Sequence, residues 1–234
     1  MPSTSARHII SINRKLLCKV SGCSRHRRGL GHWCNFHTGR SQRYGSPLGS
    51  VLRKKAYEVE YEQVRGLIAK HPTHAGVQSA VAWIGEWLSD AALGNVVPGQ
   101  ADMRRLSHHN VSPLQILTTA SAIFAYHCRE PRRLPDDADR LTFAIARAVL
   151  LLAPLDYRTS YLSGKPKSIC RPLKATTLRN VGKHLRSVLG VLFIGIVDEL
   201  NRQWQQHKDF RMSLGTSFTP HQSPAVPFNT KEKA

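Results

Sequence analysis

Acidic residues are scarce in this sequence and absent from long parts of it. Against 34 lysines and arginines there are 15 aspartates and glutamates, which leaves a formal net charge of +19. No acid precedes Glu58, although the first 57 residues carry twelve lysines and arginines, and a second acid-free stretch covers residues 157–197. Two blocks of positive charge favour a polyanionic partner, above all nucleic acid, because phosphates neutralised by Lys or Arg release bound counterions. A membrane surface and a merely basic soluble protein are the alternatives.

Long apolar runs are missing as well. The longest, VLGVLFIGIV at residues 188–197, is too short to cross a bilayer, and the first fifteen residues contain no apolar segment of the kind found in signal peptides. We therefore expect a cytoplasmic protein without a membrane partner. Cysteines stay reduced in that compartment, so a cluster of them indicates a metal site rather than disulfides.

Three of the five cysteines do cluster, near the N-terminus. They combine with a histidine as C-x4-C-x10-C-x2-H, and the four candidate ligands are Cys18, Cys23, Cys34 and His37. Each short pair can span neighbouring corners of a tetrahedron while the longer arm brings the pairs together, which is typical of Zn²⁺ sites. His26 and His32 are further candidates, and either could replace one of the four. Four protein ligands leave no open coordination position, which favours a structural over a catalytic zinc ion.

Helical patterning begins at about residue 48, whereas the segment HIISI at residues 8–12 is compatible with a short strand. We expect one helix over residues 48–70 and a second that Thr73 caps. A third is expected after Ser112, with that serine as N-cap and Pro113 as the first helical residue. A fourth is expected to begin at a group of acids suited to the positive end of a helix dipole, Asp136, Asp137 and Asp139.

The last helix is expected to be long, from about residue 173 to residue 207. Apolar residues recur along it at spacings of three and four: Leu178, Val181, Leu185, Val188, Leu192, Ile196, Leu200 and Trp204. Gly182, Gly190 and Gly195 weaken this helix, but their small size would let another helix approach closely. The same helix is the best candidate surface for self-association or for a protein partner.

These signals predict a mostly α protein in three parts. A small basic zinc-binding module covers residues 1–47, and a bundle of about five helices covers residues 48–210. Residues 211–234 are rich in Pro, Ser and Thr and are expected to form a tail without a fold of its own.

The first part resembles a known family. Its C-x4-C pair, basic residues, G-x-W-C-x-x-H and R-Y-G-S-P are similar to the small zinc-binding module of many bacteriophage and mobile-element proteins, often attached to HNH endonuclease domains. The positions that match are Cys18, Cys23, Gly31, Cys34, His37, Arg40, Arg43, Gly45 and Pro47. One residue is inserted around Trp33 relative to the family pattern. The resemblance covers about thirty residues and implies DNA contact inside a bacterial host, and it says nothing about the helical remainder.

The nuclease itself is not predicted. An HNH site needs a histidine base, then an asparagine, then a metal-binding His or Asn on a ββα fold. The candidates are His108, His109, Asn110 and His127, but after Asn110 no asparagine occurs until Asn180. The surroundings also favour helix over hairpin, so His108 and His109 are interpreted as a polar loop or a helix cap.

Other catalytic templates are also missing. The sequence contains no GK[ST] phosphate loop, no HExxH and no G-x-S-x-G. Tyr157, Tyr161, Arg158 and Arg171 suggest a tyrosine recombinase, but no His-x-x-Arg box of that family lies in this part of the chain. The two cysteines outside the cluster, Cys128 and Cys170, are interpreted as ordinary thiols, with Cys128 on a buried or half-buried helix face.

The candidate nucleic-acid contacts lie in both basic blocks. In the first they are Arg25, Arg27, Arg28, Arg40, Arg43, Arg53, Lys54 and Lys55, and in the second Lys165, Lys167, Arg171 and Lys174. Guanidinium groups on a metal-fixed loop can pair with phosphates bidentately, and a basic loop entering a helix can hold an anion. A solvated basic surface is the alternative for each block.

The resulting hypothesis is a non-catalytic nucleic-acid-binding protein of a phage or mobile element with one structural Zn²⁺, and with DNA favoured over RNA. It could act as a regulator or as an accessory factor in a nucleoprotein complex. A nuclease or recombinase with an unrecognised site is one alternative. A structural component of a virion or nucleoprotein particle is another.

Overall fold

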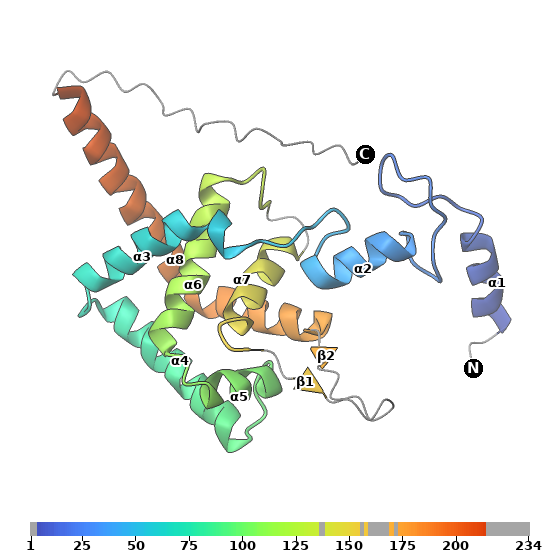
Figure 1. Cartoon of the computed structure of the whole chain (residues 1–234), viewed down its shortest axis with the longest axis horizontal. Helices are drawn as coiled ribbons and strands as arrows, with labels where there is room; N and C mark the ends of the chain where they lie inside the picture. Colours follow the sequence, from blue (N-terminus) through green and yellow to red (C-terminus); the bar gives the residue numbers. More distant parts are fainter. Residues whose placement is uncertain (1–3, 136–138, 155–156, 159–168, 171–172, 214–234) are drawn as a thin grey trace, which may run out of the picture. The chain divides into compact units, whose positions relative to one another are not determined.

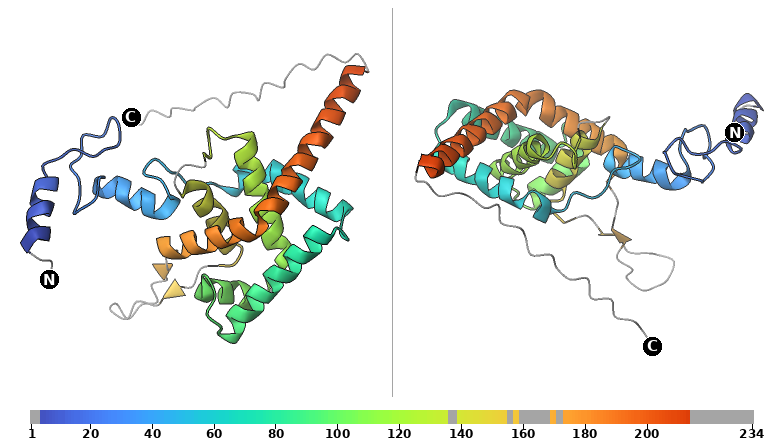
Figure 2. Two further views of the ribbon diagram at one scale, coloured as in Figure 1. Left: turned by 180° about the vertical axis from the view of Figure 1, so that it is seen from behind. Right: turned by 90° about the horizontal axis from the view of Figure 1, so that it is seen from above.

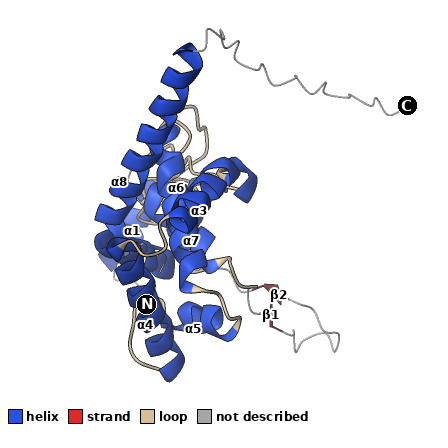
Figure 3. Ribbon diagram, turned by 90° about the vertical axis from the view of Figure 1, so that its left-hand side faces the viewer, coloured by secondary structure: helices blue, strands red, loops and turns tan. Residues whose placement is uncertain are grey.

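The structure of the protein is a computed structural model that describes residues 4–135, 139–154, 157–158, 169–170 and 173–213 (Figure 1). As the sequence predicted, this part of the chain is mostly helical (Figure 3). It also contains a Cys/His cluster near the N-terminus. Contacts divide the chain into two units, residues 1–200 and residues 201–234. The elements, in chain order, are α1 (Thr4–Asn13), α2 (Asn35–Tyr44), the 3-10 turn η1 (Lys54–Ala56), α3 (Glu58–Lys70), α4 (Ala75–Leu93), α5 (Gln100–His108), α6 (Pro113–Arg129), α7 (Arg140–Leu150), β1 (Tyr157–Arg158), β2 (Ile169–Cys170) and α8 (Ala175–Ser213).

Helix α6 lies at the centre of the first unit and packs against α3, α4 and α7 (Figures 1 and 2). It begins as predicted, because Ser112 is the N-cap, its hydroxyl accepts a hydrogen bond from the Gln115 N–H at 3.1 Å, and Pro113 is the first helical residue. Its residues from 116 to 123 are all buried, as expected for a helix covered on every side. The Thr118 and Thr119 hydroxyls remain satisfied there by donating to carbonyls one turn back, each at 2.8 Å.

Two predicted helix starts differ from the structure. The helix that Thr73 was expected to cap begins at Ala75, with His74 as its N-cap. The helix expected from residue 48 begins only at Glu58, after the turn η1. Glu58 and Glu60 lie in its first turn, where the helix dipole favours carboxylates, while the carbonyls of Leu48 and Gly49 accept hydrogen bonds from Arg40 instead.

The N-terminal segment HIISI is not a strand but part of α1, so that prediction was wrong. No described residue pairs with it as a strand partner, and Ile9 and Ile12 remain half exposed. The end of the helix is fixed by Asn13, whose buried side-chain amide donates to the carbonyls of Gly29 and Gly31, both at 2.7 Å. Helix α1 is thereby attached to the loop that carries the Cys/His cluster.

Helix α8 buries the predicted stripe at five of its eight positions and differs from it at Val188, Leu192 and Trp204. The buried residues are Leu178, Val181, Leu185, Leu189, Phe193, Ile196 and Leu200. Val188 is largely exposed, Leu192 is half-buried, and Trp204, in the second unit, is exposed. An α-helix has 3.6 residues per turn, so a strict three-and-four spacing drifts around it, and successive steps of four keep the stripe on the core.

One helix, over residues 175–205, is long and apolar enough to cross a membrane by length and composition alone. Its apolar stripe is buried against the rest of the first unit, which is compatible with a soluble protein.

A partly buried histidine of α8 packs against α4. The centre of the His184 ring lies 5.0 Å from the ring centres of both Trp83 and Trp87. Burial lowers the pKa of His184 below its ordinary value. The unfolded chain therefore binds this proton more readily than the folded chain, and the free energy of unfolding should fall as the pH drops through about 6.5.

We accordingly expect acid to destabilise the wild-type protein more than a His184→Gln variant, which cannot take up that proton. Urea denaturation of both proteins at pH 7.5 and at pH 5.5 measures the difference. Equal losses in the two proteins would show that His184 does not contribute to the pH dependence.

Candidate metal centre

The first two cysteines lie on a short hairpin-like loop. The Cys18 N–H donates to the Arg25 carbonyl at 2.8 Å, and the Arg27 N–H donates to the Leu16 carbonyl at 3.0 Å. The turn between the cysteines is closed by the Cys23 N–H, which donates to the Val20 carbonyl at 3.1 Å. Gly22 has a φ of 75° at this turn, a conformation that glycine adopts without steric cost. Backbone hydrogen bonds thus hold both sulfurs on one side of the loop.

The second pair of ligands lies at the start of α2. Cys34 is the N-cap of this helix and His37 lies in its first turn, where the Thr38 N–H donates to the Cys34 carbonyl at 2.9 Å. Residues three apart on a helix lie on the same face, so the C-x2-H spacing directs both side chains toward the loop.

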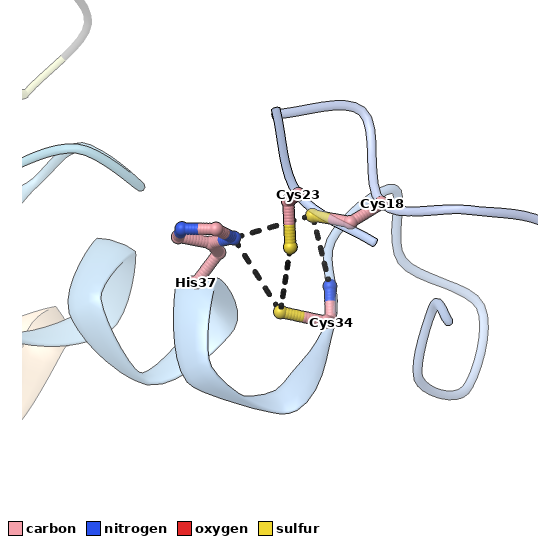
Figure 4. A group of neighbouring side chains, drawn as sticks. All are labelled: Cys18, Cys23, Cys34 and His37. Atoms are coloured by element: carbon pink, nitrogen blue, oxygen red, sulfur yellow. Dashed lines mark hydrogen bonds between the residues drawn. The ribbon is translucent and has the colours of Figure 1, made fainter. Parts of the chain in front are cut away.

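The two pairs meet in one compact cluster (Figure 4). The ligand atoms of Cys18, Cys23, Cys34 and His37 all lie within 4.8 Å of one another. The His37 Nδ1 is 3.3 Å from the Cys18 Sγ and 3.4 Å from the Cys34 Sγ, and the Cys23 and Cys34 sulfurs are 4.0 Å apart. A tetrahedral metal with bonds of about 2.3 Å to sulfur has ligand atoms about 3.7 Å apart, which matches these distances. The four side chains could therefore hold one metal ion.

Backbone donors favour the charged form of one of these thiols. Burial opposes ionisation of Cys18, but hydrogen bonds from the Val20 and Cys34 backbone and from His37 lower its pKa to about 6. A backbone hydrogen bond at Arg25 lowers the pKa of Cys23, yet burial and the neighbouring sulfurs raise it above its ordinary value overall. One of the lowering contacts on Cys18 is the Cys34 N–H, which donates to its Sγ at 3.3 Å. A metal cation would favour deprotonation of the whole set.

The structure distinguishes between the alternative ligands that the sequence left open. His26 forms an isolated backbone bridge with Leu17, and both His26 and His32 are exposed outside the cluster. Asn13, which the sequence did not single out, supports the loop that carries the cluster through its hydrogen bonds to Gly29 and Gly31. Arg27 supports the same loop, because it donates to the Leu17 carbonyl at 2.9 Å and to the Asn13 Oδ1 at 3.4 Å.

Some of the predicted nucleic-acid contacts of the first block are bonded to their own segment, whereas others are exposed. Arg27 and Arg40 donate to backbone carbonyls of their own segment, so part of their hydrogen-bonding capacity supports the local fold. The Arg25 and Arg40 guanidinium groups also lie 5.0 Å and 5.4 Å from the centre of the Phe36 ring. Six of the eight predicted contacts in this block have exposed side chains: Arg25, Arg28, Arg43, Arg53, Lys54 and Lys55.

Of the four predicted contacts in the second block, the structure describes Lys174. Lys165, Lys167 and Arg171 lie outside the described residues. Lys174 is exposed directly before α8, and its carbonyl accepts the Leu178 N–H at 3.0 Å.

Among the described residues, none of those considered for catalysis belongs to the Cys/His cluster. His108 ends α5 and His109 is its C-cap, which confirms the interpretation as a helix cap and differs from the hairpin of an HNH site. Asp139, expected among the dipole-stabilising acids, precedes α7 and pairs with Arg179 at 2.7 Å, while Asp136 and Asp137 lie outside the described residues. Cys128 is exposed, contrary to the buried or half-buried face expected for it.

Comparisons of the chain with protein-family models, with curated proteins and with solved structures found no match. The Cys/His cluster and the charges around it are therefore the basis on which a function can be assigned.

Proposed function

We propose that this chain is a non-catalytic nucleic-acid-binding protein in which a structural Zn²⁺ ion fixes a basic loop against a phosphate backbone. The observation that carries the proposal is the convergence of three cysteines and one histidine inside a segment with twelve cations and no acid. The ion supplies rigidity and the cations supply affinity.

The chemistry of the donor set favours zinc among the metals. Thiolate and imidazole are soft or borderline ligands, which exclude Mg²⁺ and Ca²⁺ in practice and suit Zn²⁺ in a tetrahedral site. Cubane iron–sulfur clusters are held by four cysteines, whereas this set has three and a histidine. Three thiolates around one Zn²⁺ also leave a net charge of −1, which the neighbouring arginines offset.

The closed coordination argues against chemistry at the metal. Four protein ligands occupy all corners of a tetrahedron, so neither water nor substrate has a position on the ion. Burial of Cys18, Cys34 and His37 separates the site further from solvent. A nuclease or recombinase centre would have to lie elsewhere in the chain.

The exposed cations of the loop are suited to phosphate contacts. Arg25 and Arg28 lie between the two ligand pairs, where the metal and the backbone hydrogen bonds restrict the loop. A guanidinium group held in this way has already lost flexibility that binding would otherwise cost. The similarity to the zinc modules of phage and mobile-element proteins supports DNA as the polymer and a bacterial cytoplasm as the location.

We expect duplex DNA to bind with an affinity that falls steeply with salt. Each phosphate contact contributes about 0.9 to the slope of log K against log salt concentration. An Arg25→Ala/Arg28→Ala variant should lower that slope by about two, as measured by gel shift across a salt series. An Arg65→Ala/Lys70→Ala variant is the matched control, because it removes the same charge from exposed positions on α3.

Equal slopes in the two variants would mean that only overall charge matters, and salt-independent binding would overturn the proposal. Matched RNA in competition tests the preference for DNA. The same DNA incubated with Mg²⁺ or Mn²⁺ tests for catalysis, and cleavage that one side-chain change abolishes would identify an enzyme instead.

A further inference from the structure

A cavity of about 220 Å³ lies where α2 meets the bundle, and five cations line it. They come from four segments: Arg43 of α2, Lys54 of η1, Arg133 after α6, and Arg140 and Arg147 of α7. The last two are seven residues apart and therefore share one face of their helix. Three of these cations, Arg133, Arg140 and Arg147, were not among the contacts predicted from the sequence.

No carboxylate of the described residues lines this cavity. Arg133 has an exposed partner in Glu130 at 3.6 Å, and Arg140 donates to the Arg133 carbonyl at 2.8 Å. Arg43 has no partner among the described residues. Five positive charges facing one space repel one another, so an anion in that space would be strongly favoured. Asp136 and Asp137, which precede α7 in the sequence, lie outside the described residues.

Arg147 provides an independent indication of a ligand. Its Nε is buried without a hydrogen-bond partner among the described residues, while its guanidinium lies 5.8 Å from the centre of the Tyr44 ring. A buried donor of a charged group is unfavourable when it is left without an acceptor, because it has lost its hydrogen bonds to water. A bound oxyanion would supply the acceptor.

The two sides of the cavity are held together by a close backbone contact. Helix α2 ends at Gly45, which has a φ of 75°, and α2 packs against α7 (Figure 1). A Cβ atom on Gly45 would lie 2.5 Å from the Asp139 carbonyl oxygen, so no larger residue would fit there without movement. Arg43 and Tyr44 are thus positioned against α7 by the chain itself, before any ligand binds.

The rest of the lining indicates what the anion is attached to. Tyr44, Phe143, Leu151 and Leu152 present aromatic and apolar surface beside the cations. Guanidinium groups bind phosphate bidentately, and aromatic faces stack on flat rings. A bare inorganic ion would leave the apolar part of the cavity without a partner.

We propose that this cavity binds an organic phosphate, namely a phosphate group carried by a nucleoside whose flat base stacks on the aromatic lining. The choice of a nucleoside rests on the proposed nucleic-acid function, whereas the choice of a phosphate rests on the five cations alone. The ligand is either a free mononucleotide or the phosphorylated end of a bound strand. Both have the same chemistry, and strands with and without a 5′-phosphate distinguish them.

Calorimetric titration of the full-length protein with deoxyadenosine monophosphate, with inorganic phosphate and with deoxyadenosine tests the site. We expect the monophosphate to bind at least tenfold more tightly than either fragment. An Arg43→Gln variant and an Arg140→Gln variant should each weaken it about tenfold, whereas Arg65→Gln, an equal change of charge on α3, should not. Arg43 has no described partner whose loss would disturb folding, and unchanged thermal unfolding of that variant verifies this.

Failure of this site and failure of the proposed function give different results. Salt-dependent duplex binding without any binding of the monophosphate, or of a 5′-phosphorylated strand over its 5′-hydroxyl form, overturns the cavity alone. Binding of the monophosphate without duplex binding overturns the nucleic-acid proposal and leaves the cavity as a nucleotide site. Equal binding of inorganic phosphate and the monophosphate overturns the role of the nucleoside.

Discussion

A Cys34→Ser variant is expected to lose the proposed Zn²⁺ ion and, with it, the fold of the segment between residues 14 and 44. Cys34 is only 2% exposed, and its sulfur lies next to Cys23 and His37. A serine hydroxyl is a neutral, hard oxygen that replaces a thiolate poorly on Zn²⁺. Structural zinc ions contribute about 10–16 kcal/mol of apparent binding free energy, so losing a ligand removes most of what orders this short, hairpin-like loop.

The substitution tests metal binding without removing the N-cap of α2. Cys34 is the N-cap of α2, and serine is among the preferred residues at that position. The start of α2 should therefore be no weaker in the variant, and a loss of structure cannot be attributed to a lost cap. The hydrophobic core of the bundle lies on α3 to α8 and does not include the cluster, so most of the helical circular dichroism should remain.

Metal analysis of the purified protein measures the outcome directly. We expect about one zinc per chain in the wild type and in Cys128→Ser, whose exposed thiol lies outside the cluster. Limited proteolysis should cut the Cys34→Ser protein before residue 45 and spare the control. A Cys34→Ser protein that retains a full zinc ion would mean that the four residues are not the ligand set.

Local signals predicted the Cys/His cluster well, because short segments of the chain contain the information that brings its four residues together. A C-x4-C pair on a turn and a C-x2-H pair on a helix each fix two ligands through their own backbone, and four ligands within 20 residues need no distant contact. Asn13 carried no such signal, since an asparagine at the end of a helix resembles many others. Its hydrogen bonds to Gly29 and Gly31 depend on how the loop returns to α1.

The fold was predictable where a segment contains residues that mark the start of a helix. Ser112 and Pro113 mark the start of α6 by capping and by a fixed φ, and both act as predicted. The start of α3 at Glu58 was not predictable in this way, because residues 48–57 contain good helix formers. In the structure the carbonyls of Leu48 and Gly49 accept hydrogen bonds from Arg40, which belongs to another element, and residues 54–56 form the turn η1.

The cationic cavity is formed by segments that are far apart in the sequence. For this reason Arg133, Arg140 and Arg147 were not predicted as anion contacts. The spacing of Arg140 and Arg147 does place them on one face of a helix. Nothing in the sequence indicates that this face meets Arg43 and Lys54 from segments about ninety residues earlier. Charge counted along the chain identified two basic blocks, whereas the structure forms a further group from residues in four segments.

A Gly182→Ala variant should be markedly destabilised, although alanine is the better helix former. Gly182 lies in α8 directly against α7, and a Cβ atom there would be 2.2 Å from the Thr142 carbonyl oxygen and 2.7 Å from its Cγ2. Backbone atoms cannot move aside cheaply, so we place the overpacking cost at about 3 kcal/mol. The gain in helix propensity offsets about 1 kcal/mol of it, which leaves a net loss of about 2 kcal/mol.

Gly190 of the same helix is the matched control, because a Cβ atom there would meet nothing within 4 Å. Gly190→Ala should stabilise the protein by about 0.5–1 kcal/mol through helix propensity alone. At about 2–4 °C per kcal/mol, thermal unfolding should show a fall of about 4–8 °C for Gly182→Ala and a rise of about 1–4 °C for Gly190→Ala. Of the three glycines for which the sequence suggested a close helix approach, only Gly182 would then have that role. A rise in Tm for both variants would contradict the contact between α7 and α8 on which this part of the core depends.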